Sequence, residues 1–108
     1  MELEQLMKAL GEPMRVRIFC LLLERKHCVR SLSKKLGVTE SAVSQHLKVM
    51  RSAGVIYGEK YGYPTHYLPV QEAVDFLAEA FGNMRTTALE LNRDASVCQC
   101  EFRKEGEV

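Results

Sequence analysis

The sequence predicts a mainly α-helical domain with one β-hairpin, on three observations. Residues 1–54 and the stretch from Val70 to Leu91 place apolar residues three and four apart, the spacing of helices that bury one face. Between them, residues 55–68 are rich in β-branched and aromatic side chains around Gly62, which is typical of two paired strands. With 46% hydrophobic residues in 108, the chain can form one domain with a modest core.

Two helices are predicted first. A short amphipathic helix ends at Gly11, and Pro13 begins the next one because the first helical position needs no N–H donor. The second helix is expected to end at about Arg25 and to pack beneath the segment that follows. The inward-facing apolar residues are predicted to be Leu3, Leu6, Met7 and Leu10 in the first helix, and Val16, Phe19, Cys20 and Leu23 in the second.

The segment from Ser31 to Gly54 predicts two further helices joined by a tight turn. Leu32 and Leu36 lie one turn apart, and the next two residues break the helix. Thr39 can cap the following helix with its side-chain oxygen, and the acidic residue after it is favourable at the positive helix end. The second helix has an apolar face at spacings of four and three, made of Val43, Leu47 and Met50.

The opposite face of this second helix is polar. Its side chains can hydrogen-bond to bases or neutralise phosphates, and they recur at helical spacing, so one DNA groove could receive them all. An ordinary amphipathic helix with a solvated polar face is the alternative. The residues predicted to contact DNA here are Ser41, Ser44, Gln45, Lys48 and Arg51.

The distribution of charge supports the DNA-binding interpretation. Residues 1–68 contain eleven Lys or Arg and six Asp or Glu, whereas residues 69–108 contain four and eight, although the net charge is only +1. The front of the chain is therefore the expected nucleic-acid face. Basic residues in or beside the predicted reading helix are Lys34, Lys35, Lys48, Arg51 and Lys60.

The predicted hairpin has strands over Val55–Tyr61 and Tyr63–Leu68, and Pro64 suits an outer edge because it lacks an N–H. Lys60 and the tyrosines near the tip could contact phosphates beside the adjacent minor groove. A hairpin with only a structural role is the alternative.

The last predicted helix carries a heptad pattern. Its apolar residues alternate at spacings of four and three, which favours pairing with a helix of a second copy. Phe76 and Ala80 form a second stripe, so the helix is also expected to pack on its own domain. A homodimer could read two half-sites of a palindromic DNA sequence, about 34 Å apart. The predicted dimer interface is Leu3, Leu6, Val74, Leu77, Phe81 and Met84.

Two stretches resemble the ArsR/SmtB family of winged-helix repressors. Residues 9–18, ALGEPMRVRI, are similar to the entry into that family's second helix, and residues 43–50, VSQHLKVM, with 53–56, AGVI, to its recognition helix and first wing strand. The resemblance extends from about Leu3 to Leu68. It implies a winged helix-turn-helix homodimer, built on the first and last helices, that leaves double-stranded operator DNA when an inducer binds. It also implies that Ser44 and Gln45 face the major groove, where Gln suits adenine.

The cysteines bear on the inducer, which in this family is a metal ion, arsenite, antimonite, or a reactive sulfur or oxidant species. Arsenic-sensing relatives often carry ELCVCDL where this chain has KHCVRSL at residues 26–32, so Cys28 matches and Arg30 replaces the second cysteine. Residues two apart in an extended tail point the same way. Cys28, Cys98 and Cys100 could therefore supply three thiolates for As(III), Sb(III), Cd(II) or Zn(II). Alternatively, the tail has no partner and Cys28 is a small buried hydrophobe.

Other inducer classes fit less well or stay open. A zinc site with histidine ligands on the last helix is not expected, because residues 70–91 contain no histidine. Cys20 resembles one cysteine of the family's persulfide and oxidant sensors but is expected in the core. A disulfide switch would need a tail cysteine to reach Cys20 or Cys28. A regulator without an inducer is also open. His46 and His66, the latter on a strand, are expected to be structural, and His27 structural or an auxiliary ligand.

Residues 1–95 are predicted to form the DNA-binding and dimerisation domain, and residues 96–108 a cysteine-containing tail. No signal peptide is recognisable, and no apolar run approaches the roughly 20 residues that span a bilayer, so a cytoplasmic protein without a membrane partner is expected. An enzyme is not expected, because the tail cysteines lack a positioned base and a convergent acid-base set. No organic cofactor is expected.

Overall fold

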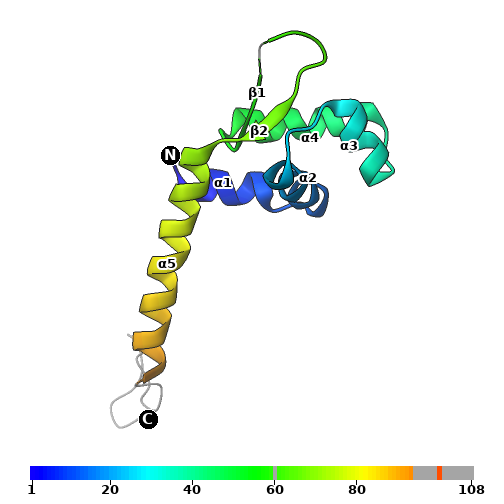
Figure 1. Ribbon diagram of the computed structural model, residues 1–108. Coiled ribbons are helices and arrows are strands. Elements are labelled where there is room, and N and C mark those ends of the chain that lie inside the picture. Colours follow the sequence, from blue (N-terminus) through cyan, green and yellow to red (C-terminus); the bar gives the residue numbers. More distant parts are fainter. Residues whose placement is uncertain (60, 94–99, 101–108) are drawn as a thin grey trace. The chain divides into compact units, whose positions relative to one another are not determined.

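The computed structural model describes residues 1–59, 61–93 and 100 (Figure 1). Two units make up the chain, Met1–Leu77 and the residues from Ala78 onward. Within the described residues, no helix is long and apolar enough to cross a membrane. The elements in chain order are α1 (Leu3–Leu10), α2 (Pro13–Glu24), α3 (Val29–Leu36), α4 (Glu40–Ser52), β1 (Ile56–Gly58), β2 (Tyr67–Pro69) and α5 (Gln71–Arg93).

The boundaries of α1 and α2 follow the predicted stop and start signals. Gly11 ends α1, and its N–H donates to the Lys8 carbonyl at 3.3 Å. Pro13 is the first residue of α2, and Glu12 caps that helix because its Oε2 accepts the Arg15 N–H at 3.1 Å. The structure ends α2 at Glu24, one residue before the predicted end.

The predicted helix-turn-helix is present as α3 and α4. Gly37 ends α3 with φ +68°, a left-handed conformation that costs glycine little because it has no Cβ. Thr39 then caps α4, since its Oγ1 accepts the Ala42 N–H at 3.1 Å. Both ends of the turn therefore have a local cause in the sequence.

The core lies where α1, α2 and α4 meet, and it corrects the predicted inward face of α2. Cys20, Val16 and Leu23 are exposed, whereas Ile18, Phe19 and Leu22 are buried. Apolar residues occur on both sides of this helix, so spacing alone does not identify the buried side. The contacts of α2 with α1, α4 and β2 decide it. The other buried side chains are Leu6, Ala9, Leu32, Val43, Leu47, Met50, Val55, Ile56, Ala73 and Leu77.

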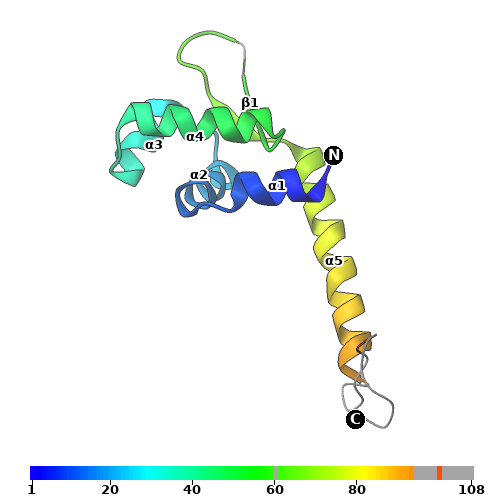
Figure 2. The same ribbon diagram turned by 180° about the vertical axis from the view of Figure 1, so that it is seen from behind.

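The wing is an antiparallel hairpin, and its strands are shorter than predicted. β1 pairs with β2 in the register Ile56↔Pro69, Tyr57↔Leu68 and Gly58↔Tyr67. Residues 61–66 form a loop that extends past α4 on the side away from α1 and α2 (Figure 1 and Figure 2). His66 therefore precedes β2, whereas the sequence had predicted it on a strand. Its carbonyl nevertheless accepts the Glu59 N–H at 2.7 Å.

The wing is also joined to the connector between α2 and α3. Tyr67 of β2 donates its N–H to the His27 carbonyl at 2.8 Å, and the His27 N–H donates back at 3.4 Å. An ion pair between Lys26 Nζ and Glu59 Oε2 lies beside this bridge at 3.2 Å. The start of α3 and the base of the wing are thus held together by backbone hydrogen bonds.

The apolar positions of the last helix fall in both units. Leu77 and Ala73 are buried in the core of Met1–Leu77, where Val70, Val74 and Phe76 pack against them. Beyond Ala78, α5 has Phe81 48% and Met84 45% exposed. Two of the six residues predicted at a dimer interface, Leu6 and Leu77, belong to the chain's own core. The dimer itself stays a prediction.

Candidate nucleic-acid interface

Helix α4 has one buried face and one face open to solvent. Val43, Leu47 and Met50 are buried, which confirms the predicted apolar face. On the other side, the predicted DNA-contacting side chains are exposed, and in the described chain none of them has a hydrogen-bond or ion-pair partner. This reading face consists of Ser41, Ser44, Gln45, Lys48 and Arg51. Its donors and acceptors are thus available to a ligand.

A polar cluster fixes α4 against α1 and α2, and sequence reasoning missed it. The Arg15 guanidinium donates through Nε to the Ala9 carbonyl and through Nη2 to the Lys8 carbonyl at 3.5 Å. Its Nη1 lies 3.4 Å from Nδ1 of His46 in α4. Glu12 Oε2 lies 3.9 Å from the same ring nitrogen. The acidic residue before Pro13 is a local signal for the cap, but nothing local indicates His46.

The wing loop presents aromatic side chains. Tyr61 is 91% exposed and Tyr63 is 98% exposed, so both ring hydroxyls can reach a ligand. Lys60, the predicted phosphate contact of the wing, lies outside the described residues. The predicted contact of the wing with the minor groove stays a prediction.

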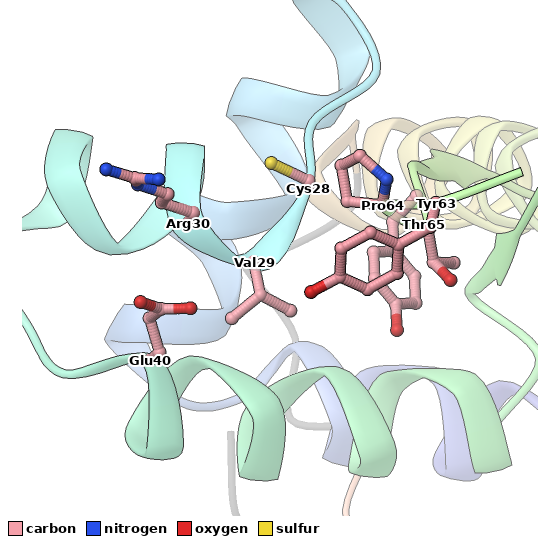
Figure 3. A pocket seen from close by; sticks show the side chains of 8 residues that line it. Cys28, Val29, Arg30, Glu40, Tyr63, Pro64 and Thr65 are labelled. Atoms are coloured by element: carbon pink, nitrogen blue, oxygen red, sulfur yellow. The ribbon is translucent and has the colours of Figure 1, made fainter.

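Cys28 occupies the N-cap position of α3 without a side-chain capping hydrogen bond, and it lines a cavity of about 650 Å³ between that helix and the wing loop. Figure 3 shows Arg30 and Glu40 on one side of this cavity and Tyr63, Pro64 and Thr65 on the other, with Cys28 beside Pro64. The thiol is half-buried. Cys28 and the wing-loop residues thus line the same cavity.

The three predicted thiolate ligands are not assembled by the described residues. Cys98 lies outside them, and Cys100 is an exposed residue of the unit from Ala78 onward. In the part of the chain that the structure describes, no group of three or more His, Cys, Asp or Glu residues could hold a metal ion. The three-cysteine site stays a prediction.

Two further residues are placed clearly. His27 is buried, and its Nδ1 lies 2.8 Å from Ser31 Oγ, which supports the expected structural role. Burial lowers the pKa of His27, and the cations Lys35 and Arg25 add to the effect. Cys20, predicted in the core, instead borders an open groove of about 540 Å³ between α2 and α3.

Comparison with known proteins agrees with this architecture. The family model described as "Bacterial regulatory protein, arsR family" matches residues 12–57, from the cap of α2 to β1. The regulator CmtR of Mycobacterium bovis is 32% identical over 106 residues, which cover 98% of this chain and 86% of that protein. The chain belongs to the ArsR/SmtB family of winged-helix transcription regulators.

Other members of the ArsR/SmtB family are similar over shorter regions. The repressor SmtB of Mycobacterium tuberculosis is 41% identical over 63 residues, which cover 58% of this chain and 47% of that protein. The activator HlyU of Vibrio cholerae is 36% identical over 62 residues, which cover 57% of the chain and 57% of that protein. The chain thus spans about half the length of these curated relatives.

Solved structures of similar proteins share the fold. Reduced HlyU from Vibrio cholerae superimposes with a TM-score of 0.60 at 32% identity, covering 68% of this chain and 79% of that one. A possible transcriptional regulator for arsenical resistance gives a TM-score of 0.66 at 30% identity, covering 77% and 85%. These relatives are named as transcriptional regulators, and family membership places the chain among regulators and not among enzymes.

Proposed function

We propose that this ArsR/SmtB protein is a transcriptional repressor that recognises operator DNA through α4. The observation that carries the proposal is the reading face, whose polar side chains are exposed while the opposite face is held in the core. An α-helix fits the major groove, where each base pair presents a distinct pattern of donors and acceptors. The side chains of α4 offer the complementary groups.

Each residue of the reading face has a proposed role. Gln45 pairs with an adenine edge through its amide, which predicts A·T base pairs in the half-site, and Ser44 contacts the neighbouring base. Ser41, Lys48 and Arg51 flank them and bind phosphates. On the wing, Lys60 and the exposed tyrosines contact the backbone beside the adjacent minor groove.

Selection of duplexes from a randomised DNA pool with the full chain tests this proposal. Gln45→Ala is expected to reduce affinity for the selected duplex by about ten-fold or more, since a bidentate base contact contributes about 1–3 kcal/mol. Affinity for a scrambled duplex should change little. Gln5→Ala, which removes an exposed glutamine of α1, is the matched control. Equal losses on both duplexes, or none, would contradict the assignment of the reading face.

We propose that the protein acts as a homodimer on a palindromic operator. The half-exposed Phe81 and Met84 support this, because apolar side chains at heptad spacing gain from pairing with a second copy. Phe81→Asp is expected to shift the sedimentation profile toward monomer and to weaken operator binding. Leu77 is a poorer test, because a charge in the chain's own core would unfold it. An unchanged profile for Phe81→Asp would contradict the proposed seam.

We further propose that a thiophilic ion is the inducer and that Cys28, Cys98 and Cys100 bind it. The support is chemical: As(III), Sb(III) and Cd(II) favour thiolates, Zn(II) accepts them, and Cys28 adjoins both the helix-turn-helix and the wing. In this proposal the tail cysteines complete the site, because Cys28 supplies only one thiolate. The ion needs to favour the DNA-free conformation by only a few kcal/mol to release the operator.

Titration of the reduced protein with arsenite, Cd(II), Zn(II) and Cu(I) tests the inducer. Thiolate-to-metal absorbance and release of the selected duplex are followed together. Binding that releases DNA and is lost in Cys28→Ser and in a chain truncated before Cys98 is the expected result. Cys20→Ser is the matched control. Release by arsenite from the truncated chain would exclude the tail as ligand.

Two alternatives make different predictions for the same titration. A thiol-redox or persulfide-responsive repressor would release DNA on oxidation, and the exposed Cys20 favours including it. In that case Cys20→Ser would lose the response. For a regulator without a small inducer, replacing Cys28, Cys98 and Cys100 by Ser would leave operator release unchanged.

A further inference from the structure

The ring of His46 in α4 lies near two residues of opposite charge, Arg15 of α2 and Glu12, the N-cap residue of α2. Both approach the same ring nitrogen. Nδ1 lies 3.4 Å from Arg15 Nη1 and 3.9 Å from Glu12 Oε2. The side chain of His46 is 25% exposed, so its proton can exchange with solvent. His46 directly follows Gln45 of the reading face.

These two neighbours require different protonation states of the ring. A guanidinium only donates hydrogen bonds, so Arg15 can bond to Nδ1 only when that nitrogen carries a lone pair and the ring is neutral. A carboxylate only accepts, so Glu12 bonds to Nδ1 when it carries a proton. In the fully protonated ring, Arg15 becomes a like charge and Glu12 an opposite one. One proton therefore selects between two mutually exclusive partners.

Both partners also hold other elements in place. Besides His46, Arg15 binds the carbonyls of Ala9 and Lys8 at the end of α1. Glu12 accepts the Arg15 N–H as the cap of α2. A change of partner at His46 thus alters the only side-chain hydrogen bond that, among the described residues, ties α4 to this junction.

The charges around the ring can be listed by element. Arg15 comes from α2 and Glu12 is the N-cap residue of that helix, and Lys8 of α1 contributes its carbonyl to Arg15. On α4 itself, Lys48 lies two residues further on. Within the described chain, α3 and β1 provide no charged contact to His46. The response to protonation is thus governed by Arg15 and Glu12.

We propose that His46, Arg15 and Glu12 form a proton-dependent latch on the recognition helix, in which Arg15 is a positioning residue. Neutral His46 is held by Arg15 and keeps α4 aligned with α1 and α2. Protonated His46 turns from Arg15 to Glu12, α4 loses the side-chain hydrogen bond that connects it through Arg15 to the end of α1, and discrimination between DNA sequences falls under acidic conditions. The consequence for DNA rests on the proposed function, whereas the exchange of partners does not.

The exchange of partners is tested without DNA, by NMR titration of the full chain from about pH 8 to about pH 5.5, which spans ordinary histidine protonation. Backbone amides of residues 44–48 are expected to shift together with the His46 ring in the wild type. Glu12→Gln and Arg15→Met should each remove that coupling. Arg17→Met, which removes an exposed charge from the same helix, should keep it. The latch would be overturned if the amide shifts of residues 44–48 did not follow the His46 ring in the wild type. It would also be overturned if they followed the ring in Glu12→Gln and Arg15→Met as closely as in the wild type.

The consequence for DNA is tested by measuring the ratio of affinities for the selected and scrambled duplexes over the same range. The ratio is expected to fall about five-fold in the wild type, the effect of losing one hydrogen bond. In His46→Gln, which keeps the other two histidines, it should stay nearly constant. An equal fall in His46→Gln would overturn the proposed effect on DNA. If no duplex is bound at either pH, the proposed function fails, and the NMR titration still decides the exchange.

Discussion

Replacing Thr39 by alanine should destabilise the folded chain by about 1 kcal/mol, the usual contribution of a threonine N-cap. The first N–H groups of a helix have no partner within it, and Thr39 Oγ1 accepts the one from Ala42 at 3.1 Å. Position 42 is an alanine, so no side chain reaches back from there to share the capping. Thr39 is exposed, so its truncation leaves no cavity, and the loss of the cap accounts for the whole effect.

Urea unfolding followed by circular dichroism at one protein concentration measures this effect. Thr39→Ser keeps the hydroxyl and is expected to lie within a few tenths of a kcal/mol of the wild type. A loss of about 1 kcal/mol in Thr39→Ala corresponds to a Tm lower by about 4–8 °C for a domain of this size. Fraying at this end should also reduce affinity for the selected duplex, because Ser41 lies in the first turn of α4. Equal destabilisation by serine and alanine would refute the role assigned to the hydroxyl.

Further stability predictions follow from other local geometries, each measured by the same unfolding assay. Gly37→Ala should lower the free energy of unfolding by about 1–2 kcal/mol, because φ is +68° at this position. An added Cβ would meet no atom within 4 Å, so backbone strain is the only cause. An unchanged free energy of unfolding would contradict that origin. Met50→Ala should cost about 2–5 kcal/mol, since the side chain is fully buried, and a loss near zero would mean that α4 is not packed as described. Lys26→Met should change stability by less than about 1 kcal/mol, because its ion pair with Glu59 is partly exposed to solvent. A larger loss would show that the wing depends on this pair.

The accuracy of prediction from the sequence varies with how local the cause of each feature is. The ends of α1 and the start of α2 depend on Gly11 and Pro13, whose effects act within a turn, and both were predicted to the residue. The cap at Thr39 was also predicted, because a capping hydrogen bond acts within one turn. The exposed reading face was predicted because the buried residues of α4 all lie on one side. The wing was predicted in kind, but its strands pair over only three residues each among those described.

The sequence by itself thus determined the order of the helices, the wing, and which side of α4 faces solvent. Only the tertiary structure decided which side of α2 is buried, because that helix is apolar on both sides and its packing partners choose Ile18 and Leu22 over Val16 and Cys20. It also decided that Arg15 meets His46, a residue 31 positions away in the chain. Periodicity and capping act between neighbours along the chain, whereas such contacts exist only after distant helices have packed together.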